Sequence, residues 1–299
     1  MVSILIHATE QGLAYGIAAL GVFITYRILR FPDLTVDGSF VTGAAIASSL
    51  LVVQGFDPLL VLFIAFGVGC LAGTLTGLLN TRLGITDLLA GVLSMIMLYS
   101  INLRIMGRPN ISLLRVETIT RTINQAFPTL GSVAVLVFVA LVVLVIKVLL
   151  DVFLKTEVGL ALRATGDNEA MITAQGVNTK TMKVMGLAIS NGLVAFSGGL
   201  VAQYSGFADV GMGMGTIVTG LAAVIIGSSL IRSRKVGWMT VSVLVGSLIY
   251  RIAVMFALRY GYVIGFQASD LKLVTSLLVI IALVVPAFRE RLMRKVGSC

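Results

Sequence analysis

Few side chains in this sequence have the type and spacing that catalysis or metal binding requires. The histidine His7 lies near the N-terminus, and the two cysteines are Cys70, in an apolar run, and Cys299, at the terminus. The lone histidine, near the N-terminus, is not expected to belong to a Ser-His-Asp set, and two distant cysteines form no disulfide framework or metal cluster. The chain also lacks the glycine-rich phosphate loop that ends in Gly-Lys-Ser/Thr. The sequence therefore predicts no catalysis, no metal site and no cofactor held by this chain.

Polar side chains inside the apolar runs are the remaining candidates. They are Asn80, Asn102, Asn191, Gln203 and Arg251. Such residues either hydrogen-bond neighbouring helices or line a pathway through a membrane. Arg251 has Asp209 and Asp270 as candidate ion-pair partners. The runs contain no series of acids suited to a proton relay, which argues against an ion-coupled carrier.

The elements that position these residues follow from composition. The chain of 299 residues is 58% hydrophobic and 12% charged, with a mean hydropathy of +1.05. Soluble domains carry about 25% charged residues, so most of this surface is expected to face lipid. The net charge of +9 fits cations on cytoplasmic loops better than nucleic-acid binding. The first cation is Arg27, so the N-terminus lacks the basic start of a signal peptide and is expected to be retained.

Runs of about 20 mostly apolar residues predict nine membrane-spanning helices in a single all-α transmembrane domain, residues 1–299. The predicted spans are 10–29, 36–54, 58–80, 85–104, 130–150, 182–204, 212–231, 236–258 and 270–287. Asp33 and Asp37 make the second span the weakest. A re-entrant piece in either of the first two spans would change the count to eight or ten.

The cations predict the orientation of these spans. Placing loop 155–181 in the cytoplasm puts fourteen Lys and Arg residues on that side and six on the other. The N-terminus is then outside and the C-terminus inside. The long outer segment 107–129 is either a short amphipathic helix on the membrane or a plain loop.

Two segments of the chain are similar and predict an inverted repeat. Phe31-Pro-Asp-Leu-Thr-Val36 resembles Phe207-Ala-Asp-Val-Gly-Met212, and each is followed by a Val-Thr-Gly and a small-residue helix. Inverted repeats are common in transporters, with the pathway at the repeat interface. We interpret Asp33 and Asp209 as caps of broken helices in preference to pathway groups. The full set of pathway or helix-break candidates is Asp33, Asp37, Asn191, Gln203, Asp209 and Arg251.

The polar segment Arg163–Val177 lies between two long apolar runs and predicts a helix of about eight residues. Asp167 is the expected N-cap, and Gly176 is expected in the left-handed C-terminal position. A helix this short and polar does not cross a bilayer. We expect it to dock on a soluble partner.

The same loop resembles that of a known family. The segments are Gly159-Leu-Ala-Leu-Arg-Ala-Thr-Gly-Asp-Asn-Glu-Ala-Met171 and Gln175-Gly-Val-Asn178. They are similar to the cytoplasmic loop of ATP-binding-cassette (ABC) importer permeases, in the branch of the branched-chain amino acid and ribose permeases. Three further segments resemble a sub-branch that works with lipoprotein binding proteins and takes up aromatic amino acids such as tryptophan or tyrosine. They are Ser190-Asn-Gly-Leu193, Ala202-Gln-Tyr204 and Gly206-Phe-Ala-Asp-Val-Gly-Met212.

The resemblance implies a type II importer fold in which two permease copies, by default a homodimer, surround one pathway. It implies that the loop helix docks on a separate cytoplasmic ATPase, which binds ATP and magnesium, and that a binding protein delivers the nutrient outside. The residues implied in coupling are Arg163, Asp167, Asn168, Glu169, Ala170, Met171 and Gly176.

The sequence thus predicts a permease subunit in a prokaryotic inner membrane. An aromatic amino acid is the first expected substrate, followed by a branched-chain amino acid and then a nucleoside or sugar. An autonomous carrier or channel is the alternative, and the predicted docking helix argues against it. A lipid-modifying enzyme is a second alternative, and the lack of His, Cys and clustered acids argues against that.

Overall fold

The computed structural model describes residues 2–128, 131–233, 235–263 and positions 273, 275–277, 279, 280 and 284. The elements of the first half are α1 (Val2–Val22), the π-helix η1 (Phe23–Leu29), α2 (Thr35–Ser49), the π-helix η2 (Leu50–Gln54), α3 (Pro58–Thr81), α4 (Asp87–Met106), β1 (Asn110–Ser112) and α5 (Ile119–Ala126). Those of the second half are α6 (Ser132–Phe153), α7 (Glu157–Asp167), α8 (Glu169–Ala174), α9 (Thr179–Ser205), β2 (Phe207–Asp209), α10 (Thr216–Leu230) and α11 (Val236–Val263).

The predicted all-α membrane fold is confirmed, but the count of nine spans is not. Seven helices in the described residues are long and apolar enough to cross a membrane. The predicted span 212–231 is reduced to α10, of 15 residues, because residues 211–215 form turns. The predicted span 270–287 lies mostly outside the described residues.

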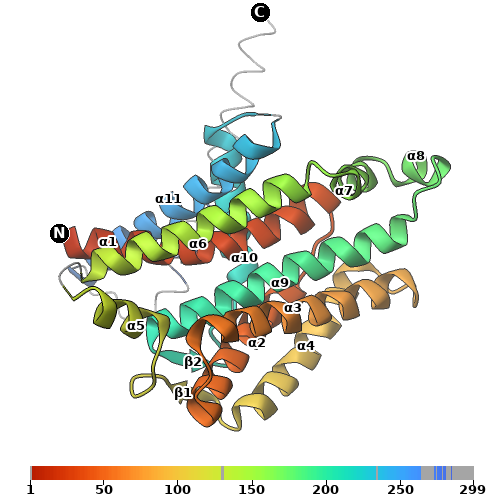
Figure 1. The fold of residues 1–299 in the computed structure, drawn as a ribbon. Coiled ribbons are helices and arrows are strands. Elements are labelled where there is room, and N and C mark those ends of the chain that lie inside the picture. Colours follow the sequence, from red (N-terminus) through yellow and green to blue (C-terminus); the bar gives the residue numbers. More distant parts are fainter. Residues whose placement is uncertain are drawn as a thin grey trace, which may run out of the picture.

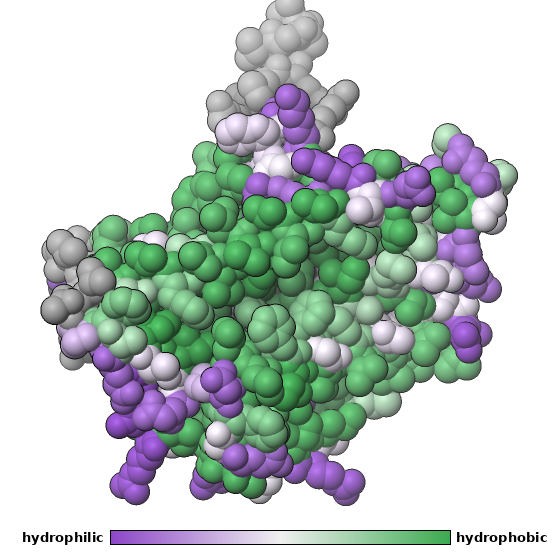
Figure 2. Space-filling view, viewed as in Figure 1, coloured by the Kyte–Doolittle hydropathy of each residue, from purple (hydrophilic) through white to green (hydrophobic). Residues whose placement is uncertain are grey.

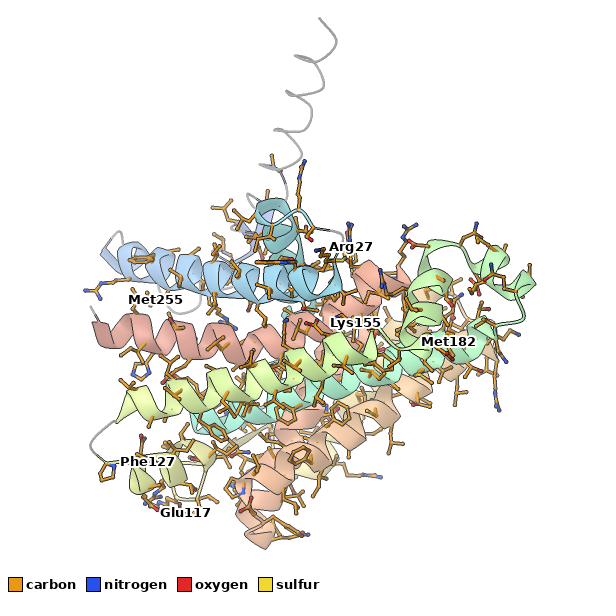
Figure 3. The ribbon with its side chains drawn as sticks, turned by 45° about the horizontal axis from the view of Figure 1, so that its top comes forward. Arg27, Glu117, Phe127, Lys155, Met182 and Met255 are labelled. Carbon is orange, nitrogen blue, oxygen red and sulfur yellow. The ribbon has the colours of Figure 1, made fainter. Side chains whose placement is uncertain are left out.

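The helices form a bundle with polar ends. Figure 1 shows α1, α6 and α9 lying side by side, with α5 near one end of the bundle and α7 and α8 at the other. Figure 2 shows a broad apolar surface on this face, with hydrophilic residues gathered toward opposite ends. In Figure 3, Glu117 and Phe127 flank α5 at one end, and Met182 of α9 lies toward the other. This is the distribution expected of a protein that crosses a bilayer.

Helix α9 lies at the centre and packs against α1, α2 and α3. Small residues allow its backbone to approach its neighbours closely. A Cβ added to Gly198 would lie 1.9 Å from the Phe40 carbonyl oxygen, and one added to Gly43 would lie 1.7 Å from that of Ala195. Such close packing replaces the hydrophobic driving force that lipid removes.

The helices pack in a two-fold repeating pattern. Helices α2 and α3 pack on α9, and α10 and α11 pack on α1. The two matching sequence segments also have the same local structure. Asp33 Oδ1 accepts the Thr35 N–H at 2.9 Å, and Asp209 Oδ1 accepts the Gly211 N–H at 2.7 Å. Both contacts are between residues i and i+2, which is the geometry of an Asx turn.

The segment 107–129 contains both a strand and a helix. Strand β1 pairs with β2 in antiparallel register, with Ile111 opposite Ala208. The helix α5 is amphipathic, and its first residue, Ile119, is buried against the bundle. Of the two alternatives for this segment, the short amphipathic helix is therefore present, although it covers only part of the segment.

Candidate functional site

A buried polar cluster holds the start of α2 inside the bundle. Asn191 of α9 donates its Nδ2–H to Asp33 Oδ2 at 2.7 Å, and its Oδ1 accepts the Ser39 hydroxyl at 2.7 Å. The Thr35 and Thr76 hydroxyls are hydrogen-bonded at 2.8 Å. All five side chains are buried, with Asn191 completely inaccessible. The cluster therefore satisfies polar groups that would otherwise be isolated in an apolar interior.

Asp37, one turn into α2, caps a different helix. Its Oδ2 accepts the Gly215 N–H at 3.0 Å, and its Oδ1 accepts the Ile217 N–H at 2.8 Å. Gly215 is the N-cap of α10 and has φ 87°, which favours glycine. A carboxylate at this position meets the positive end of the α10 dipole. The N-termini of the two repeat-related helices, α2 and α10, are thereby joined.

A cavity of about 250 Å³ lies beside this junction. It is lined by Asp37, Gly38, Val41, Met95, Ile96, Tyr99, Asn102, Val210 and Met214. Its wall combines a carboxylate and an amide with apolar and aromatic side chains. Sites for small organic ligands have this composition: an apolar lining with a few polar groups.

The other sequence candidates stabilise the ends of helices. Gln203 Oε1 accepts the Ile119 N–H at 3.1 Å, and its Nε2 donates to the Pro58 carbonyl at 3.0 Å. Asp209 Oδ2 accepts a bond from Asn110 Nδ2 at 3.4 Å. Asn80 Nδ2 donates to Asp87 Oδ1 at 2.6 Å. These contacts tie α5, β1 and α4 to the bundle.

Arg251 stacks over an aromatic ring. Its guanidinium carbon lies 3.5 Å from the centre of the Tyr15 ring. The candidate pair with Asp209 is wrong, because Asp209 instead bonds Asn110 and the Gly211 backbone. The other candidate, Asp270, lies outside the described residues. A cation–π contact with α1 stabilises this partly buried cation, whose buried Nε has no hydrogen-bond partner.

Sequence analysis missed a polar cluster where α1 meets the end of α9. Glu10 is 2% exposed and its Oε2 accepts the Tyr204 hydroxyl at 2.8 Å. His7 Nδ1 lies 3.0 Å from the same oxygen. Glu10 was placed at the edge of the first predicted span, and α1 in fact begins eight residues earlier, at Val2. An acid inside an otherwise uncharged, helix-length run at the N-terminus is the signal that would have identified it.

The cytoplasmic-loop candidate consists of two helices in place of the predicted one. Asp167 is the last residue of α7, and Asn168 is the N-cap of α8, where its Oδ1 accepts the Met171 N–H at 3.0 Å. The predicted cap at Asp167 is therefore wrong by one residue. Gly176 has φ 87°, the left-handed conformation expected of it.

Helix α8 presents most of its residues to the exterior. Ala170 is exposed and Met171 is 59% exposed, whereas Ile172 is buried. Glu169 Oε2 accepts a hydrogen bond from Lys183 Nζ of α9 at 2.7 Å. That bond holds the pKa of Glu169 below its ordinary range. An exposed methionine on a short, anchored helix is typical of a contact surface.

Helix α7 connects this loop to the helix break at Asp33. A Cβ added to Gly166 would lie 1.8 Å from the Ile28 carbonyl oxygen of η1. Arg30 donates to Asp167 Oδ1 at 3.0 Å. Only Phe31 and Pro32 separate Arg30 from Asp33, so α7 is packed directly against the segment that leads into the buried cluster. The remaining loop candidate, Arg163, faces a cleft between α7 and α11.

A helical bundle with an apolar surface, two helix breaks joined in its interior and two short helices in a polar loop at one end has the architecture of a multi-pass membrane protein. The comparisons identify its family. Residues 4–284 match the family described as branched-chain amino acid transport system / permease component, and the chain belongs to this family.

Two relatives support the assignment. The chain is 42% identical over 276 residues to the tyrosine transport system permease protein of Clostridioides difficile (strain R20291), covering 92% of this chain and 89% of the relative. It is 37% identical over 193 residues to an uncharacterised protein of Rickettsia prowazekii (strain Madrid E), covering 64% of this chain and 65% of the relative. No solved structure matches. The resemblance drawn from the sequence is confirmed: the protein is a transport permease of the inner membrane and not an enzyme.

Proposed function

We propose that this chain is the membrane-spanning subunit of an ATP-driven importer for an aromatic amino acid, with tyrosine as the first candidate. The exposed surface of α8 carries this proposal. A carrier driven by an ion gradient has no use for an ordered contact helix outside the membrane, whereas a permease driven by a separate ATPase requires one. The name of the 42% identical relative supports tyrosine.

In this proposal Ala170 and Met171 of α8 contact the ATPase, which binds ATP and magnesium. Closure of the ATPase moves α8 and α7, and the close contact between Gly166 and Ile28 transmits that movement to η1. The helix break at Asp33 then allows α2 to tilt relative to α9. The two arrangements of the break correspond to inward-open and outward-open states.

The cavity beside Asp37 lies where the repeat-related helices meet, which is the expected position of a transport pathway. Its volume of about 250 Å³ and its Tyr99 wall suit an aromatic side chain. We place the N-terminus outside and the C-terminus in the cytoplasm, with a binding protein at the outer face. A second copy of the chain, related by two-fold symmetry, completes the pathway.

The test uses one variant in α8 and a matched control. Met171→Arg places a charge in the proposed ATPase contact, and Leu114→Arg makes the same change at a residue that is 77% exposed near β1, distant from α8. Each variant is expressed with the partner ATPase, purified in mild detergent and assayed for ATPase retention and for uptake of labelled tyrosine.

We expect Met171→Arg to lose at least tenfold of both retention and uptake, and Leu114→Arg to keep both. Uptake by the chain alone, without ATP, would overturn the importer proposal in favour of a carrier. Uptake of leucine in place of tyrosine would overturn only the assignment of tyrosine as the substrate.

A further inference from the structure

An open cleft of about 660 Å³ lies between the end of α6, α7 and the start of α11. It is lined by Lys147, Asp151, Lys155, Arg163, Lys235, Val236, Gly237, Trp238 and Val241. Figure 3 labels Lys155 at the end of α6. The cleft is distinct from the cavity beside Asp37 and from the exposed surface of α8.

The charges in the cleft are strongly unbalanced. Lys147 and Asp151 form an ion pair, and the Thr240 hydroxyl of α11 donates to Asp151 Oδ1 at 2.6 Å. This group is internally neutral and links α6 to α11. Lys155 and Lys235 are exposed and have no acidic partner within the described part of the chain.

Arg163 adds a third cation that lacks an acidic partner among the described residues. Three positive side chains therefore line one cleft, from the turn between α6 and α7, from α7 and from the residue before α11. Like charges near one another repel, and an anion bound between them would offset that repulsion. Phosphate is the anion that Lys and Arg clusters most often bind.

The rest of the cleft is apolar and continues into surface that faces lipid. Trp238 is 56% exposed at the first turn of α11, and Leu144 and Val148 of α6 are 60% and 48% exposed. Tryptophan is enriched at the level of the lipid headgroups. Acyl chains can therefore lie along α6 while a phosphate occupies the basic part of the cleft.

We propose that this cleft binds the phosphate headgroup of an anionic phospholipid from the leaflet on the α7–α8 side. The shared chemistry, a phosphate among cations, would also fit a soluble phosphate. The adjoining apolar surface of α6 and the exposed indole favour the lipid. Bound there, the headgroup bridges Arg163 of α7 to Lys235, directly before α11, and holds the loop that carries α8 against α11. This proposal does not depend on the substrate or on the ATPase.

The experiment measures lipid binding by the full-length purified permease. The protein is delipidated in detergent, and its thermal unfolding is followed while phosphatidylglycerol, phosphatidylcholine or inorganic phosphate is added. The test variant is Lys155→Gln/Arg163→Gln/Lys235→Gln. The matched control is Arg104→Gln/Arg108→Gln/Arg115→Gln, which removes the same charge at the opposite end of the bundle.

Each cation near an anionic headgroup raises affinity by about fivefold, so the triple variant should weaken phosphatidylglycerol binding by roughly 100-fold. We expect the control to bind within about threefold of the wild type and phosphatidylcholine to bind weakly to all three proteins. Lipid binding by the wild type should also weaken with added salt, because Lys155 and Lys235 are exposed to solvent.

Equal binding of the two lipids, or equal loss in both triple variants, would overturn the proposal. Inorganic phosphate stabilising the protein as well as phosphatidylglycerol would replace the lipid with a soluble anion. If the test variant keeps phosphatidylglycerol binding but loses the ATPase, the cleft is a protein contact and the proposal is wrong. If the triple variant does not fold, the single variant Lys155→Gln and a salt titration of the wild type test the proposal instead. Phosphatidylglycerol binding that neither of them weakens would overturn it.

Discussion

Replacing Asn191 with leucine should destabilise the bundle more than any conservative change elsewhere in α9. Its side chain makes three hydrogen bonds: to Asp33 Oδ2, to the Ser39 hydroxyl and to the Leu187 carbonyl. Leucine has nearly the same shape but removes all three. Asp33 Oδ2 would then remain in an apolar interior without this donor.

The magnitude follows from the number and type of the lost bonds. A bond to a charged group contributes about 1.5–3 kcal/mol, and a neutral buried group left without a partner costs about 1–3 kcal/mol. Leucine recovers part of this cost by burying more apolar surface. With three bonds lost, we therefore expect Asn191→Leu to lower the free energy of unfolding by about 3–5 kcal/mol.

Asn102→Leu is the matched control, because Asn102 is equally inaccessible and the substitution is the same. Its Nδ2 donates to the Gly38 carbonyl at 3.2 Å, but that oxygen also accepts the Thr42 hydroxyl at 3.0 Å. Its Oδ1 has no hydrogen-bond partner. Asn102→Leu should therefore change the unfolding free energy by less than about 1 kcal/mol. Thermal unfolding in detergent measures both, and equal shifts for the two variants would refute the reasoning.

Two further predictions concern packing and pH. Gly198→Ala should destabilise by about 1–3 kcal/mol or prevent folding, because its Cβ would meet the Phe40 carbonyl at 1.9 Å. Gly67→Ala is the control: its added Cβ would meet nothing within 4 Å, so it should be neutral or stabilising. If the two variants have similar expression and unfolding temperatures, the close contact between Gly198 and Phe40 is contradicted. The pKa of Glu169 is lowered by Lys183, so the bond between them is fully present above the ordinary value of 4.5 and is lost as pH falls through the lower folded pKa. Amide exchange in α8, corrected for intrinsic rates, should thus be constant between about pH 6 and pH 8, and a change within that range would exclude this bond as the anchor.

The helices could be predicted from the sequence because lipid imposes a simple local rule: about 20 apolar residues span the hydrocarbon core. That rule fails where a helix starts inside the bundle. The turns at Gly213 and Gly215 shorten the predicted span 212–231, and the carboxylate that caps its start comes from Asp37, far away in sequence. Apolar composition alone contains no signal for this contact.

The candidate site was likewise predictable only where the signal is local in the sequence. Local signals identified Asp33, Asn191 and Gly176, because an acid beside a proline, an amide in an apolar run and a glycine after a short helix each stand out. Long-range partners could not be assigned. Arg251 has an aromatic partner where an acidic one was expected, and a charge pattern along the chain does not distinguish the two.

The buried cluster and the coupling loop are parts of one connected arrangement. Helix α7 lies on η1, η1 leads within a few residues to Asp33, and Asp33 is bonded to Asn191 of α9. Helix α9 also follows α8 directly in the chain and is held to it by the bond between Lys183 and Glu169. A force on α8 therefore reaches the cluster from both sides, through η1 and through α9. Because tightly packed interiors shift between discrete arrangements and do not deform continuously, such a force would be expected to change the hydrogen bonds at the break before it bends the helices. If the proposed importer mechanism holds, the break between η1 and α2 is where ATP-driven movement would reach the proposed pathway.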